Sequence, residues 1–194
     1  GIIGDTIHGH LSHLTAYERS GVIIKEMHSD ITVSPVASIC KNLYLETNNS
    51  KIYDYYAMLY RHFPDFLDYI DKVVMVGHLK NASVDAKDIA FFAPQLHKIP
   101  SAILKVNGTG SGTVANLEAK DVTATDGIST IKGDIKMRGL PDIYNTLIDY
   151  QKGEILTNGP AVFKYAPMLR DNPNIALDHI IYAYFNGSYT GYIE

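Results

Sequence analysis

The chain has 194 residues, of which 46% are apolar, so a folded chain is expected rather than a disordered one. Its formal net charge is −4 and no basic run is present, which argues against a nucleic-acid-binding surface. No stretch of eighteen apolar residues occurs, so we expect no helix that spans a bilayer. The single cysteine excludes an internal disulfide and leaves the compartment open.

The first half of the chain alternates apolar and polar residues, which is typical of β-strands with one wet face. Strands are predicted over residues 5–17, 22–33, 39–47, 51–60 and 73–80. Between the last two, Pro64 and aromatic residues at three- and four-residue spacing predict one or two helical turns over 63–70. A short helix is predicted over 85–93, and Pro94 is expected to end it.

The longest alternating stretch covers residues 102–114. Its even positions are all apolar or glycine: Ala102, Leu104, Val106, Gly108, Gly110, Gly112 and Val114. Its odd positions are mostly polar, so the pattern predicts a long strand with one apolar face. After it we expect strands over 128–139, 147–150, 154–157 and 177–193, a proline-led turn at 140–143 and a short helical element at 159–167.

Three features recur in the same order along the chain. Residues 64–66 return at 141–143, 91–96 return at 164–169, and 107–114 return at 186–193, with offsets of 77, 73 and 79 residues. Such self-similarity predicts a repeat array with a unit of about 75 residues. Short helices between long strands also argue against a doubly wound parallel sheet, which needs full crossover helices.

The offsets divide the chain into three predicted parts. Residues 1–62 form a β segment of a preceding repeat, residues 63–139 a full unit with its short helix and long strand, and residues 140–194 a truncated following unit. The sequence starts at Gly1 without a methionine and stops at Glu194 in a strand-like pattern. We therefore expect a segment of a longer protein.

No pattern in the chain marks a catalytic, metal or cofactor site. The glycine run at 108–112 lies on a strand face and opens no convincing helix, so it does not predict a phosphate-binding loop. His8 and His10 share a strand face and His13 follows, but no nearby group completes a metal site. Cys40 lacks a nucleophile motif and is expected to be a buried small residue. We expect no enzyme activity, no catalytic or metal residues and no cofactor.

Alternation alone does not show whether the apolar strand faces form a closed core or an open groove. They build a closed core in a β-sandwich, whereas in an open curved sheet they remain a groove for lipid or protein. On alternation alone, a closed core is the favoured interpretation. The residues expected to line such a groove are Ile23, Met27, Ile31, Val33, Leu43, Leu45, Val73, Met75, Leu79, Leu104, Val106, Gly108, Gly110, Gly112, Val114, Ile131, Ile135, Met137, Ile181 and Phe185.

Several stretches in order along the chain resemble one family. They are Tyr17–Gly21, Asn48–Ser50, Asp88–Pro94, Gly108–Asn116, Gly139–Ile143 with Thr146, and Asn186–Gly191. Together they resemble the TamB (translocation and assembly module) branch of the AsmA-like envelope proteins, in the form found in Bacteroidetes-type bacteria. The resemblance implies an elongated, taco-like β-sheet with a hydrophobic interior, and it carries over no catalytic residue.

The resemblance also implies a place and partners. TamB-like proteins are anchored in the inner membrane of Gram-negative bacteria, cross the periplasm, and serve phospholipid transport and outer-membrane biogenesis with TamA, an Omp85-type outer-membrane barrel. The expected role is therefore a segment of such a bridge that shields lipid acyl chains, membrane-anchored through regions outside this chain. Two alternatives stay open: a structural or adhesive β-repeat module, and a factor for outer-membrane protein insertion.

Overall fold

The structure is a computed structural model that describes residues 1–19, 21, 23–89, 102–165, 167–172 and 174–192. It is mainly β, which confirms this part of the prediction. The strands are β1 (Ile2–Ile3), β2 (Thr6–Tyr17), β3 (Ile23–Ser34), β4 (Ala37–Glu46), β5 (Lys51–Leu59), β6 (Val74–Asp85), β7 (Ile103–Thr113), β8 (Asn116–Thr125), β9 (Thr130–Arg138), β10 (Leu147–Thr157) and β11 (Ala183–Tyr192).

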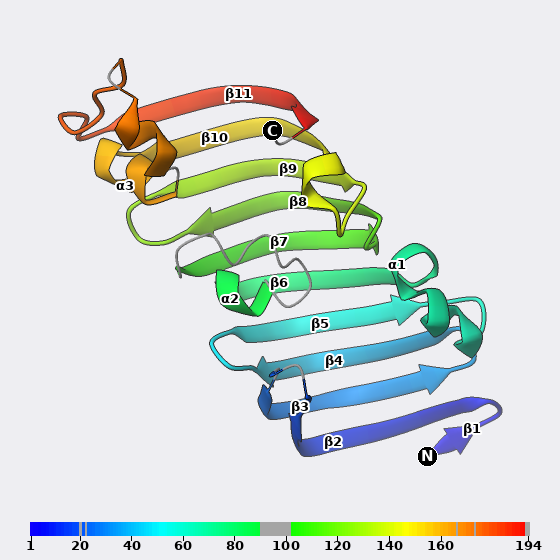
Figure 1. Cartoon of the computed structure of the whole chain (residues 1–194). Coiled ribbons are helices and arrows are strands. Elements are labelled where there is room, and N and C mark those ends of the chain that lie inside the picture. The colour runs from blue at the N-terminus through cyan, green and yellow to red at the C-terminus, as the bar shows by residue number, and fades with distance from the viewer. Residues whose placement is uncertain (20, 22, 90–101, 166, 173, 193–194) are drawn as a thin grey trace.

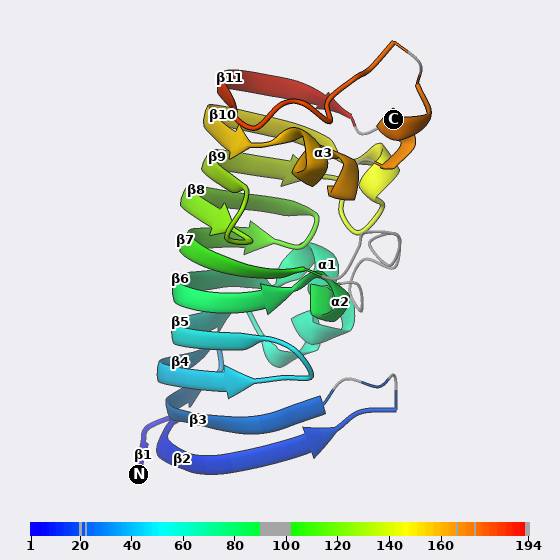
Figure 2. The ribbon, with the colours of Figure 1, turned by 90° about the vertical axis from the view of Figure 1, so that its left-hand side faces the viewer.

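All described strands belong to one antiparallel sheet, in which each strand pairs with its neighbours in sequence from β1 to β11 (Figure 1). The sheet is open and curled, and the helices lie on one side of it (Figure 2). Antiparallel neighbours can be joined by short loops, as between β3 and β4, whereas longer connections carry the helices.

The helices are short and sit in the connections between strands. They are η1 (Phe63–Asp68), α1 (Tyr69–Lys72), α2 (Ala86–Ile89), η3 (Ile143–Asn145), α3 (Gly159–Tyr165) and η4 (Pro167–Asp171). Pro64 stands in the first turn of η1, and Asp142 caps η3 by accepting bonds from the backbone of Tyr144 and Asn145. Both proline-led elements predicted from the sequence are therefore present.

Several predicted boundaries are wrong. Residues 116–125 form β8, which the alternation did not reveal. The two strands expected at 147–150 and 154–157 are one strand, β10. The last strand starts at Ala183 instead of residue 177. Of the helix expected at 85–93, residues 86–89 form α2, and the rest lies outside the described residues.

A line of register shifts crosses the middle of the sheet. In β4, β6, β8 and β10 the extra residue adopts a left-handed backbone at nearly the same φ, at Asn42 (51°), Asn81 (53°), Asp121 (51°) and Lys152 (52°). The facing strands carry small residues there: Ser29, Gly108, Gly133 and Gly187. We call this line the crease, because β-bulges bend the strands that contain them.

Polar side chains on the odd-numbered strands hold the bulges in place. Asn42 Nδ2 donates to Asp30 Oδ2 at 2.7 Å, and Asn81 N donates to Asn107 Oδ1 at 2.8 Å. Asp121 N likewise donates to a side chain, that of Asp134 on β9, at 2.9 Å. Asn and Asp tolerate a left-handed backbone better than other non-glycine residues, so the residue types fit their positions.

The sheet has no second sheet packed on it within the described part of the chain. The accessible surface is 12076 Å², whereas a compact monomer of the same mass has about 9,200 Å². The buried apolar residues described are Leu43, Ala57, Tyr60, Val73, Ala82, Ala102, Ala161 and Phe163. In the same ranges, no helix has both the length and the apolar character needed to cross a membrane.

Candidate apolar binding face

One face of the curled sheet is apolar along its whole length. We call it the inner face, because the short helices lie on this side (Figure 2). Contacts with α1 identify it: Tyr69 Oη lies 3.1 Å from Tyr56 Oη and 4.0 Å from Met58 Sδ. Residues that are directly paired across an antiparallel sheet share a face, so the strand pairing extends this assignment to every strand.

The pairing orders the inner face into three rows. Row A contains Ile7, Val33, Ser38, Met58, Met75, Gly112, Leu117, Met137, Ile148 and Gly191. Row B contains Gly9, Ile31, Cys40, Tyr56, Gly77, Gly110, Ala119, Ile135, Tyr150 and Tyr189. Row C lies beyond the crease and contains Leu14, Met27, Leu45, Ile52, Ala82, Val106, Ala124, Ile131, Ile155 and Phe185.

Rows A, B and C lie on the same face although the crease separates row C from rows A and B. β9 keeps period two across the crease, so Ile131 in row C and Ile135 in row B point to the same side. Besides tyrosine hydroxyl groups, Ser38 is the single polar side chain in the three rows, and its Oγ lies 2.9 Å from Tyr60 Oη. No charged side chain belongs to any row.

The inner face remains partly open to solvent. Ile7 and Phe185 are 54% and 51% exposed, and most other row members are intermediate rather than buried. Exposed apolar surface on this scale is typical of a site that binds lipid or protein. The fold is therefore not the closed core that alternation alone favoured.

Methionines and aromatic rings give this surface its character. Four of the five methionines in the chain, Met27, Met58, Met75 and Met137, lie in the rows. Methionine has three rotatable bonds and a polarizable sulfur, so it adapts to ligands of variable shape. The inner face can therefore adapt its shape to a ligand where these methionines line it.

Aromatic rings cover glycines at the C-terminal end of the inner face. A Cβ atom on Gly133 or Gly153 would collide with the Tyr150 ring, so this ring lies directly over both glycines. Tyr150 Oη donates to the carbonyl of Lys132, which fixes the ring there. Phe185 covers Gly187 in the same manner, with 2.9 Å between the ring and a built Cβ. These glycines are needed for close ring packing.

An aromatic cluster from η1 and α1 covers a small part of the inner face. Tyr60, Phe63, Phe66 and Tyr69 contact one another, with ring centroids 4.9 to 6.4 Å apart. Burial and the hydroxyl of Tyr69 raise the pKa of Tyr56, so the Tyr56 hydroxyl stays neutral over the physiological range.

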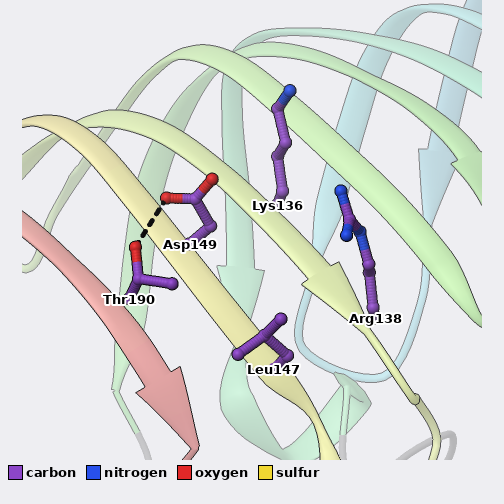
Figure 3. A pocket seen from close by; sticks show the side chains of 5 residues that line it. All are labelled: Lys136, Arg138, Leu147, Asp149 and Thr190. Carbon is purple, nitrogen blue, oxygen red and sulfur yellow. Dashed lines mark hydrogen bonds between the residues drawn. The ribbon is translucent and has the colours of Figure 1, made fainter.

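The outer face carries cross-strand ion pairs between β8, β9 and β10. Lys136 pairs with Glu118 at 3.4 Å and Lys152 with Asp134 at 2.7 Å. A shallow hollow of about 140 Å³ on this face is lined by Lys136, Arg138, Leu147, Asp149 and Thr190 (Figure 3). Thr190 Oγ1 donates to Asp149 Oδ1 at 3.1 Å, and bonds from Gln151 and Thr190 lower the pKa of Asp149. The hollow is too small for a lipid tail.

The structure also shows where His8, His10 and Cys40 lie. His8 and His10 lie on the outer face, where their Nδ1 atoms bond Thr32 and Asp30. The residues that the structure describes contain no group of three metal-ligating side chains. Cys40 is half-buried in row B, and burial raises the pKa of its thiol. The sequence predicted a buried small residue here, and that prediction is wrong.

Most residues predicted to line an apolar groove lie together on the inner face. In the three rows are Met27, Ile31, Val33, Leu45, Met75, Val106, Gly110, Gly112, Ile131, Ile135, Met137 and Phe185. Beside them, at the crease or the row C rim, are Leu43, Leu79, Leu104 and Gly108.

Four predicted residues are placed elsewhere. Val73 is fully buried before β6, and Val114 lies in the turn between β7 and β8. Ile181 precedes β11 and is 91% exposed. Ile23 is the first residue of β3 and lies beyond a further register shift, so the pairs assign it to no row.

Sequence reasoning missed much of the inner face on the bulged strands. Leu117, Ala119 and Ala124 were not found because Asp121 shifts the alternation by one residue within β8. Tyr56 and Met58 were not separated from outward residues, because β5 is apolar on both faces. A search for alternation that permits one slip at Asn or Asp is the signal that finds such strands.

Comparisons with protein-family models, with curated proteins and with solved structures find no match to this chain. The resemblance to TamB-like proteins therefore rests on the sequence stretches given above, and function is argued below from the inner face.

Proposed function

We propose that the inner face shields lipid acyl chains, and that the chain is a segment of a TamB-like bridge for phospholipid transport across the periplasm. The observation that carries the proposal is the three uncharged rows, which run across ten strands and whose polar groups are tyrosine hydroxyls and Ser38. A repeat organisation and a groove that stays open for cargo belong to this proposal.

The energetics favour a tail on this surface. Each methylene moved from water to an apolar surface gains about 0.8 kcal/mol, so half-burial of fourteen methylenes gives roughly 6 kcal/mol. Ten strands at a spacing of about 4.8 Å make each row roughly 43 Å long, enough for a tail to slide by equivalent contacts. Because the rows hold no charge, the headgroup stays outside in water.

Localisation and partners follow from the resemblance and are part of the proposal. The cargo is phospholipid, the place is the periplasm of a Gram-negative bacterium, and the outer-membrane partner is a TamA-like or other Omp85-type barrel. The protein is anchored in the inner membrane through regions outside this chain. Lipid transport of this kind requires no catalytic residue or cofactor in the segment.

Cys40 provides a direct test because it is the single cysteine and lies in row B. Its alkylation by a small soluble maleimide is measured at pH 8 with and without short-chain phosphatidylcholine below its micelle concentration. We expect lipid to slow the reaction at least fivefold. The matched control is Cys40→Ser with Ser111→Cys, which places the thiol on the exposed outer side of β7. Equal lipid effects at both positions would refute selective binding.

A second test works in cells. A photoreactive amino acid at Leu104 or Ile135 is expected to capture phospholipid, whereas the same group at Lys136 on the outer face is expected to capture none. Protein adducts without lipid at both inner positions would contradict the proposal and favour the adhesive or protein-insertion alternatives.

A further inference from the structure

A helical segment crosses the row A side of the inner face at β5 and β6. We call residues 63–72, which form η1 and α1, the strap. Tyr69 of the strap places its hydroxyl oxygen 3.1 Å from Tyr56 Oη in row B and 4.0 Å from Met58 Sδ in row A. Met75 on β6 is paired with Met58 and lies beside this contact. The strap therefore covers row A on these strands.

The strap is fixed at both of its ends. Asp65 is 3% exposed, and its Oδ2 accepts bonds from the backbone N–H groups of Arg61 and His62 at 2.8 and 3.4 Å. Ile70 O accepts a bond from Ala115 N, in the turn between β7 and β8, at 3.1 Å. The strap thus reaches from the end of β5 past β6 to the end of β7, and it is held in place by bonds on both sides.

The opposite end of β6 is also occupied. α2 follows β6 there, on the same side of the sheet as α1 (Figure 2). Asp88 fixes α2 to the turn between β4 and β5, because its Oδ2 accepts bonds from Thr47 Oγ1 at 2.5 Å and Asn49 N at 3.1 Å. Ala82, the row C residue of β6, is fully buried. The strap takes one end of β6 and buried Ala82 the other, which leaves Gly77, in row B, between them.

Gly77 and its paired neighbour Gly110 leave room above the sheet at this point. Among the described residues, the atom nearest to a Cβ built on Gly77 is a ring carbon of Tyr56 at 4.0 Å, and for Gly110 it is the carbonyl oxygen of Glu118 at 3.8 Å. Neither glycine has a positive φ, and no register shift separates the pair. Glycine inside a strand marks a bulge or the close approach of a ligand or another backbone. No bulge or packed backbone explains this pair, which leaves a ligand.

We propose that the strap and the α2 rim form a neck in the lipid path, and that an acyl chain crosses β6 and β7 over Gly77 and Gly110. The inference rests on the proposed function, because it assigns a position to the same cargo. Tyr69 keeps the chain off row A and so determines which part of the inner face is available at the neck. A side chain at either glycine closes the neck, although the backbone there accepts one.

The first test maps where a lipid tail lies. The purified chain is photo-crosslinked with a short-chain phosphatidylcholine that carries a diazirine near the end of one tail, and adducts are located by mass spectrometry. Met58 and Met75 lie in row A beside the strap, whereas Met137 lies in row A on β9, beyond the turn where the strap ends. We expect at least fivefold more adducts at Met137 than at either of the other two. Tyr69→Ala is expected to raise labelling of Met58 to the level of Met137.

A pair of variants tests the neck itself. Gly77→Leu fills the row B position and is expected to lower labelling of Tyr56 and Ala119, on either side of the glycine pair, at least fivefold. The matched control is Ser111→Leu, which places the same side chain on the outer side of β7 and is expected to be labelled as the wild type is. Far-ultraviolet circular dichroism of both variants shows whether the sheet is retained.

The possible failures are distinguishable. Equal labelling of Met58, Met75 and Met137 in the wild type would overturn the neck and leave lipid binding to the inner face intact. Undiminished labelling of Tyr56 in Gly77→Leu would do the same. Absence of adducts from all three rows would instead overturn the proposed function, and the neck with it.

Discussion

Asp126 links α3 to the turn between β8 and β9. Replacing it measures how much this link contributes to the free energy of unfolding. Its Oδ1 accepts bonds from the backbone N–H groups of Ile128 and Ser129 at 2.9 and 2.7 Å. Its Oδ2 accepts bonds from Tyr165 Oη at 2.6 Å and Lys164 Nζ at 3.2 Å. The carboxylate side chain is 4% exposed, so water competes weakly for these donors.

The two oxygens allow the contributions to be separated. Asp126→Asn keeps an acceptor for the turn but loses the charged acceptor for α3. A hydrogen bond to a charged group contributes about 1.5–3 kcal/mol, and the ion pair to half-exposed Lys164 at most about 1 kcal/mol. We expect Asp126→Asn to lower the free energy of unfolding by about 2 kcal/mol, and Asp126→Ala, which loses both sets, by about 3–4 kcal/mol.

The same interaction predicts a pH dependence. Burial raises the pKa of Asp126, but bonds from Tyr165, Ser129 and Ile128 outweigh burial, so the pKa lies below its ordinary value. A carboxyl group whose pKa is lowered by folding stabilises the fold above its unfolded pKa and loses this effect as the pH falls. The difference between wild type and Asp126→Asn should be constant from pH 5 to 8 and shrink below about pH 4.

Urea unfolding followed by circular dichroism measures these values, and hydrogen exchange of the α3 amides shows whether the loss is local. Two results would refute the reasoning: an Asp126→Asn variant within 0.5 kcal/mol of the wild type, or a difference that grows as the pH falls. Faster exchange in α3 with unchanged global stability would mean that the helix opens independently of the sheet.

The remaining predictions concern the inner-face glycines and the crease. Gly153→Ala should cost about 2–3 kcal/mol, because its Cβ would collide with Tyr150, whereas Gly110→Ala, whose Cβ has an ordinary 3.8 Å contact, should cost under about 1 kcal/mol. Asn81→Val should cost about 1–2 kcal/mol at its left-handed backbone, while Asn81→Gly should be near neutral. Urea midpoints test both pairs, and equal costs within either pair would contradict the structure.

The sequence predicted the odd-numbered strands best, for a physical reason. β7 and β9 alternate without interruption, so their inward residues could be assigned by counting. In β8 and β10 a bulge at Asp121 or Lys152 reverses the alternation halfway along the strand. Period two then fails although the strand continues, which is why β8 was missed and β10 was read as two strands.

The candidate site was predictable as a face but not as an open surface. Alternation identifies which residues point together, and it is the same for a sandwich core and for an uncovered sheet. The two cases differ in whether a second layer of structure packs on the apolar face. No local sequence pattern shows whether such a layer is present. The helical connections were predictable, because Pro64 and Pro141 restrict the local backbone.

The meander order of the strands has a consequence for how the sheet forms. Each long strand meets its partners within a short distance along the chain, so loop closure costs little and folding can spread strand by strand from any nucleus. Each added strand covers the edge of the one before it. A sheet built in this way frays from its ends inward, so its margins exchange with solvent sooner than strands such as β6 and β7 at its centre.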